Sequence, residues 1–119
     1  MKYLLLIYGA EANWAQLDER QLAEAYDGYR RYTDELAQAG VLRDGHELQP
    51  TSTAKTVRSR GGKALATDGP FAETKEQLGG FYLIEVEDAA AAAHWAARCP
   101  GAADGCVEIR PVAENPPPT

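Results

Sequence analysis

The sequence predicts an α+β domain in which two helices cover one face of a mainly antiparallel sheet. Three observations favour this fold class. Apolar runs of strand length lie at residues 3–8 and 80–87, apolar residues recur at helical spacing over 18–39, and an alanine-rich helical segment at 88–98 precedes a final alternating run. At 119 residues the chain has the length of one domain.

The first strand is predicted at residues 3–8, an unbroken apolar run. Because side chains alternate across a strand, both of its faces are apolar. A long helix is predicted over residues 18–39. Asp18 and Gln21 have the spacing of a capping box at its start, and Gly40 stands where a helix C-terminal glycine belongs.

Residues 41–49 predict a short strand, and residues 53–67 ("TAKTVRSRGGKALAT") predict a hairpin. Gly61 and Gly62 supply the positive φ values that a two-residue primed turn needs. We interpret Gly79-Gly80 as ending the next turn and as letting the backbone approach closely before the strand at 80–87.

The second helix is predicted from Asp88 to Arg98, with Asp88 as its cap and Pro100 as its stop. Residues 106–113 form the last predicted strand, so the domain is expected to span residues 1–113. Residues 114–119 ("ENPPPT") are expected to be a disordered proline-rich tail.

This element order predicts a ferredoxin-like α+β unit. Helices on one side of the sheet leave the second apolar face of the first strand uncovered. A second copy of the chain would cover it, with two sheets stacked about 10 Å apart in a symmetric dimer. A homodimer is therefore predicted.

Composition and charge exclude several classes of protein. The formal net charge is −6 with acids and bases interspersed, which argues against nucleic-acid binding and favours neutral or cationic small ligands. Cys99 and Cys106 form no CxxC pair, so no metal site is predicted. The apolar start is too short to span a membrane, and a cytoplasmic protein with reduced thiols is expected.

The stretch "TDGPFAETKEQLGGFYLIE", residues 67–85, resembles the signature of the DGPF group of the YCII-related family. The similarity extends from "MKYLLLIYG" through "WAARCP" to "VEIRPV". This resemblance implies a dimeric α/β barrel. It also implies a relation to cofactor-free enzymes, among them a dehydrochlorinase acting on a chlorinated hydroxyquinol, and to proteins often encoded beside extracytoplasmic-function sigma factors.

Shorter proteins of this kind carry a histidine on the first helix and an aspartate before the proline that follows the second helix. These two residues are proposed to be a catalytic dyad. In this sequence Tyr29 stands at the first position and Cys99-Pro100 replaces the Asp-Pro pair. The dyad therefore does not carry over.

The DGPF turn has two interpretations. Asp68, Gly69 and Pro70 suit a locked turn, with Phe71 filling an apolar gap. Alternatively, the rigid turn holds the Asp68 carboxylate at the edge of a pocket, as acid–base chemistry requires. Glu73 and Lys75 are either a solvated charged segment or further members of that site.

If a site exists, Asp68, Glu73 and Lys75 are its predicted catalytic residues. Its predicted pocket lies between helix and sheet, lined by five further residues: Gly69, Pro70, Phe71, Tyr29 and Tyr82. His46 is expected in a loop, His94 at the surface, and Cys99 as a buried structural thiol.

Two functional hypotheses follow. The first is an enzyme without a cofactor that moves a proton on a small organic molecule, leading to isomerisation or elimination. The alternative is a non-catalytic ligand-binding or regulatory module associated with a sigma factor. The residues alone leave the choice open.

Overall fold

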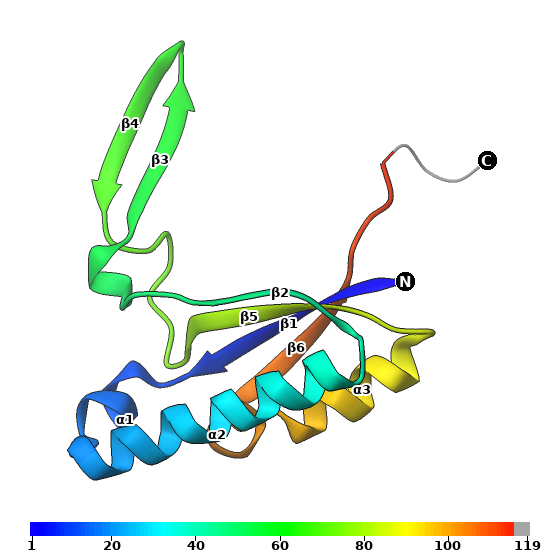
Figure 1. The fold of residues 1–119 in the computed structure, drawn as a ribbon. Helices are drawn as coiled ribbons and strands as arrows, with labels where there is room; N and C mark the ends of the chain where they lie inside the picture. Colours follow the sequence, from blue (N-terminus) through cyan, green and yellow to red (C-terminus); the bar gives the residue numbers. More distant parts are fainter. Residues whose placement is uncertain (116–119) are drawn as a thin grey trace.

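The fold, described over residues 1–115 by a computed structural model, consists of a sheet, a helical layer and a separate hairpin (Figure 1). The four-stranded sheet has the order β2-β5-β1-β6, and all neighbouring strands are antiparallel. Its strands are β1 (Lys2–Gly9), β2 (Leu42–Glu47), β5 (Gln77–Glu85) and β6 (Cys106–Pro111). This arrangement confirms the predicted ferredoxin-like α+β class.

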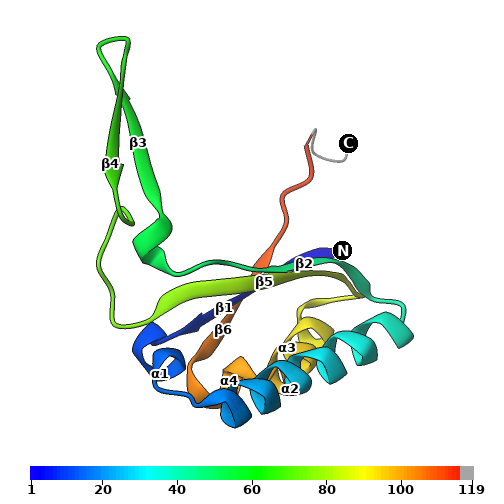
Figure 2. The same cartoon turned by 60° about the vertical axis from the view of Figure 1, so that its left-hand side comes forward.

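The helices lie together on one face of the sheet (Figures 1 and 2). The two main ones are α2 (Glu19–Gln38) and α3 (Ala89–Arg98). The predicted capping box is present, since Asp18 Oδ1 accepts a hydrogen bond from Gln21 N at 2.8 Å and Asp18 N donates to Gln21 Oε1 at 3.1 Å. Gly40, with φ +75°, follows α2 as predicted.

Three short helices were not predicted: α1 (Glu11–Ala15), α4 (Gly101–Asp104) and the 3-10 helix η1 (Thr51–Thr53). Pro100 follows the end of α3, as predicted. It is also the N-cap residue of α4, since proline suits the first turn of a helix. Gly101 is required there for space. A Cβ atom on it would lie 2.6 Å from Ile7 Cγ2 and 2.7 Å from Tyr29 Oη.

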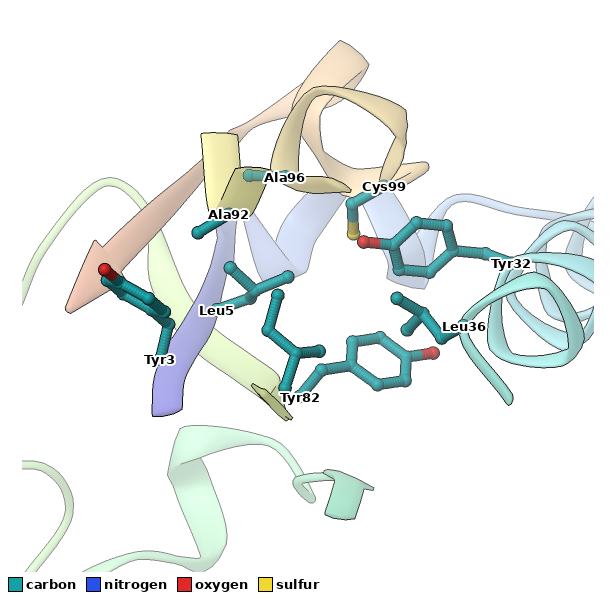
Figure 3. Close-up of a cluster of buried hydrophobic side chains, with 9 residues drawn as sticks. Tyr3, Leu5, Tyr32, Leu36, Tyr82, Ala92, Ala96 and Cys99 are labelled. Carbon is teal, nitrogen blue, oxygen red and sulfur yellow. The ribbon is translucent and has the colours of Figure 1, made fainter. Parts of the chain in front are cut away.

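The core lies between the helices and the sheet (Figure 3). Leu5, Leu36 and Ile84 are completely buried in it. The alanine-rich face of α3 approaches the sheet closely through Ala92 and Ala96. Aromatic rings and one thiol complete the cluster: Tyr3, Tyr32, Tyr82 and Cys99.

The predicted hairpin is present, but it stands apart from the main sheet. Strands β3 (Lys55–Arg60) and β4 (Lys63–Asp68) form their own two-stranded sheet. Gly61 and Gly62 have φ values of +57° and +79°, which confirms the primed turn. The hairpin projects on the side of the sheet opposite the helices (Figures 1 and 2).

The structure differs from the sequence-based predictions at the glycine pair and at His46. The glycine pair does not end a turn, because Gly79 and Gly80 lie inside β5. The close backbone approach predicted at this pair is present at Gly80, since a Cβ atom on it would lie 2.8 Å from the His46 carbonyl oxygen of β2. His46 itself is part of the edge strand β2 and not of a loop.

The C-terminal segment leaves the sheet after β6. This strand ends at Pro111, and residues 112–115 continue without helix or strand. The rest of the predicted tail, residues 116–119, lies outside the described residues. In the described part of the chain, no helix is long and apolar enough to cross a bilayer.

Candidate functional site

Asp68 lies at the end of β4, at the base of the hairpin. Its Oδ1 atom accepts a hydrogen bond from Lys55 Nζ at 2.9 Å, and the side chain is 88% exposed. In the single chain this carboxylate therefore belongs to a surface ion pair.

The DGPF turn is fastened to the hairpin by its backbone. Gly69 N donates to the Ala54 carbonyl at 2.7 Å, and the Gly69 carbonyl accepts from Thr56 Oγ1 at 2.9 Å. Gly69 has φ +96°, a left-handed conformation that favours glycine. Phe71 fills no apolar gap in the subunit, because it is 81% exposed.

The loop between the turn and β5 contains Glu73 and Lys75, and both side chains are exposed. Within residues 1–115 neither has an ion-pair partner within 4.0 Å. Glu76, next to them, lies with its Oε1 atom 3.9 Å from Cys106 Sγ on β6. The loop therefore reaches the sheet at the start of β6.

Glu11 ties the base of the hairpin to the main sheet, a role that sequence reasoning missed. Its carboxylate accepts from Thr51 N at 2.7 Å and from Thr51 Oγ1 at 2.8 Å. The Glu11 backbone N–H donates to Gln77 Oε1 at 2.9 Å. Because the two partners are 40 and 66 residues away along the chain, no local pattern signals these contacts.

The sheet face opposite the helices is apolar along its two central strands. Tyr3 and Leu5 of β1 point into the core, so their neighbours Leu4 and Leu6 point to the opposite face. The strand register places Leu83 and Phe81 of β5 beside Leu4 and Leu6. These apolar side chains are half-buried. We call this surface the open face.

Polar groups border the open face on both edge strands. On β6, Glu108 accepts from Tyr8 Oη at 3.5 Å and from Arg110 at 2.7 Å. On β2, the His46 ring lies 5.8 Å from the Phe81 ring, and its Nε2 atom is 3.1 Å from Asp44 Oδ1. The open face is therefore an apolar stripe between two polar rims.

Tyr29 and Cys99, at the positions of the dyad in similar proteins, are close together on the helix side of the sheet. Burial raises the pKa of the Cys99 thiol, which has the predicted buried environment. Burial and then the neighbouring Cys99 raise the pKa of Tyr29. Both groups are thus protonated at neutral pH, and neither can serve there as a general base.

Tyr82 belongs to the same interior. Its hydroxyl lies 2.7 Å from Thr33 Oγ1, and burial raises its pKa. The structure thus places Tyr29 and Tyr82 between α2 and the sheet, whereas Asp68 and the DGPF turn lie at the base of the projecting hairpin. The single chain does not bring the two groups into a common pocket.

Two shallow hollows, of about 490 Å³ and 410 Å³, lie along the helical layer. The larger one is bounded by Val86 and Trp95, and the smaller one by Tyr32 and the Glu35–Arg98 ion pair. Neither hollow is lined by a predicted site residue. Among residues 1–115, no three His, Cys, Asp or Glu side chains are grouped to hold a metal ion.

The chain is similar to known proteins over nearly its whole length. The family model of the YCII-related domain matches residues 1–115. An uncharacterized protein, R00369 of Rhizobium meliloti (strain 1021), is 38% identical over 119 residues, covering 95% of this chain and 93% of the relative.

Proposed function

Because the chain belongs to the YCII-related family, we propose that it acts as a homodimer that binds a small organic molecule between its two open faces. The observation that carries this proposal is the composition of the open face. An apolar stripe with a few polar groups at its borders is the usual lining of a small-molecule site.

The open face also supports the dimer. Complete burial of a leucine or phenylalanine side chain stabilises by roughly 1.5–3 kcal/mol. Leu4, Leu6, Phe81 and Leu83 are all only half-buried in the subunit. A second open face stacked on the first would remove these side chains from water.

Binding without catalysis is favoured by the state of the ionisable groups. Tyr29 and Cys99 are held protonated by burial, and the Asp68 carboxylate is exposed and paired with Lys55. A general base needs a pKa near the working pH and a position against the substrate. The subunit alone offers no such group in a desolvated site among the described residues.

The dimer is tested by sedimentation velocity on the wild-type protein and on Leu6→Asp. The added carboxylate would be buried between the sheets, so the variant should be monomeric at concentrations where the wild type is dimeric. Ala23→Asp, which adds the same charge on an exposed position of α2, should remain dimeric. A wild-type protein that stays monomeric at high concentration would refute the proposal.

Ligand binding is tested by thermal shift with a panel of neutral and cationic aromatic compounds. The chain contains only two phenylalanines, which provide a matched pair. Phe81→Ala should abolish the shift, and Phe71→Ala should retain it. If Phe71→Ala alone abolishes the shift, the site lies at the DGPF turn and not on the open face.

Proton transfer at Asp68, Glu73 and Lys75 is a second candidate, favoured by the position of the DGPF turn. The hairpin whose base it forms stands on the side of the sheet that a second copy would cover (Figure 2). Removal of water there would strengthen the electrostatic effect of each charge. The predicted association with a sigma factor rests on the family resemblance.

Deuterium exchange at carbon, followed by NMR on compounds that bind, tests the catalytic candidate. Asp68→Asn and Lys75→Met should then stop exchange while the fold and the binding persist. If bound compounds exchange no deuterium with the wild-type protein, this candidate is wrong.

A further inference from the structure

The hairpin of β3 and β4 has almost no support from the rest of its own subunit. Within residues 1–115 its strands pair only with each other, and every side chain except Thr56 is exposed. Val57 is 64% exposed and Leu65 is 50% exposed. Because an isolated two-stranded hairpin is marginally stable in water, such a ribbon is expected to pack against another surface.

The two faces of the hairpin differ in chemistry. The register pairs Val57 with Ala66 and Ser59 with Ala64, so these small side chains share one face. The other face contains three of the four cations, since Arg60 is paired with Lys63 and Arg58 with Leu65, whereas Lys55 lies on the Val57 face in its pair with Asp68. One face thus suits close packing, and the other suits anionic groups.

The hairpin is basic, although the chain as a whole is acidic. Residues 55–68 contain four cations and one carboxylate, a net charge of +3, whereas the whole chain has −6. The remaining residues therefore have a net charge of −9. Within residues 1–115, Arg58, Arg60 and Lys63 have no carboxylate within 4.0 Å.

The position and length of the hairpin suit contact with a second copy. It rises on the same side of the sheet as the open face (Figures 1 and 2). Six residues per strand correspond to a length of about 20 Å, whereas stacked sheets lie about 10 Å apart. A ribbon of this length extends past the sheet of any copy stacked on the open face.

We propose that this hairpin is an arm that clasps the second copy of the chain. The Val57 face packs on the partner subunit, and Arg58, Arg60 and Lys63 bind carboxylates of its acidic surface. The inference rests on the proposed dimer and adds its second contact.

A nucleic acid is the other anionic partner that a basic ribbon could meet. The charge of the remaining residues argues against it, because a body of net charge −9 repels phosphates. The same charge attracts the arm of a second copy. Charge complementarity thus favours self-association.

The test compares two triple variants of identical net charge. Arg58→Glu/Arg60→Glu/Lys63→Glu reverses the arm, and Arg20→Glu/Arg30→Glu/Arg31→Glu reverses exposed cations of α2. Both change the net charge from −6 to −12, so the general charge repulsion between two copies is the same in both variants. The arm variant should dimerise about tenfold or more weakly than the α2 variant in sedimentation velocity at low salt.

A second measurement locates the arm directly. Carbodiimide coupling joins an amine to a nearby carboxylate, and mixed ¹⁴N/¹⁵N dimers distinguish links between subunits from links within one. Mass spectrometry should find Lys63 joined to a carboxylate of the other copy. The Lys63→Arg variant should lose this link and keep the dimer, because it keeps the charge.

The outcomes separate the arm from the dimer itself. A monomeric wild type refutes both. A dimer that the two triple variants weaken equally, without the Lys63 link, refutes the arm and leaves the dimer of stacked sheets. If a DNA duplex binds the wild type and not the arm variant while dimerisation is equal in both triple variants, the arm has a different partner and the inference is wrong.

Discussion

At the scale of single residues, the roles of two glycines and one thiol depend on neighbours that are far away in sequence. A Cβ atom on Gly80 would press against the carbonyl oxygen of His46, whereas one on Gly79 would meet only the Ile7 carbonyl oxygen, at 3.9 Å. Cys99 is buried beside Tyr29, and both are protonated. The sequence marks these residues as unusual, but only the packed chain distinguishes their roles.

Alanine substitutions at the glycine pair should have unequal effects. Gly80→Ala places a Cβ atom 2.8 Å from a backbone oxygen of β2, so the edge strand must shift. We expect a loss of about 1–3 kcal/mol in the free energy of unfolding, typical of overpacking. Gly79→Ala is the matched control and should cost less than about 1 kcal/mol. Urea unfolding measures both, and equal losses would contradict this account of the strand pairing.

The raised pKa values predict a loss of stability at alkaline pH. Burial raises the pKa of Cys99 above its ordinary value of 9.0, and those of Tyr29 and Tyr82 above 10.0. The unfolded chain therefore releases these protons at lower pH than the folded one. Stability should be constant below about pH 8 and should fall as pH rises through 9 and 10.

Urea unfolding midpoints between about pH 7 and 10.5 measure this loss of stability. If these groups had ordinary pKa values in the folded protein, the loss would not occur. Cys99→Ala should remove the earliest part of the decline, near the ordinary thiol pKa of 9.0. Cys106, which is exposed, provides the control, and Cys106→Ala should leave the profile unchanged.

At the scale of elements, patterns of neighbouring residues predict helix ends and turns correctly. Features that depend on distant residues have no such pattern. The capping box of α2, the glycine after it and the primed turn of the hairpin all depend on neighbours within a few residues. The start of β5 at Gln77, the existence of α4 and the isolation of the hairpin depend on residues far away in sequence. No pattern in a short window contains that information.

The hairpin should open independently of the main sheet. Its strands share no ladder with β1 or β5, so amides of β3 and β4 should exchange with deuterium faster than those of β1 in dilute protein. If the arm packs on a second copy, protection of β3 and β4 should rise with concentration. Hydrogen exchange read by mass spectrometry at two concentrations measures this. Protection that is equally high in the hairpin and in β1 at every concentration would contradict it.

At the scale of the whole molecule, the chain is less compact than its length suggests. Its radius of gyration is 16.6 Å, against roughly 13–14 Å for a compact chain of this size. The two apolar faces of β1 and the hairpin are both predictable from the sequence, and the second copy that would cover the open face stays a prediction. The direction of the hairpin was not predictable, because the contacts of Glu11 with Thr51 and Gln77 set it.

The candidate site is predictable only in part, because it too depends on contacts between residues that are far apart in sequence. Residue types and rigid turns identified the DGPF segment, but exposure and grouping of side chains emerge only in three dimensions. Asp68 and Phe71 are both exposed at the surface of the chain. In the proposed dimer, the chemistry of the segment depends on the copy that lies opposite the open face.

The separate ladder of the hairpin has a practical consequence. Gly61 and Gly62 form a tip where a Cβ atom added to either residue would meet no atom within 4 Å, its chain neighbours aside, in the described part of the chain. A fluorescent label or a short inserted epitope at this tip should leave the four-stranded sheet intact. The tip is thus a natural place for an optical reporter of assembly in living cells.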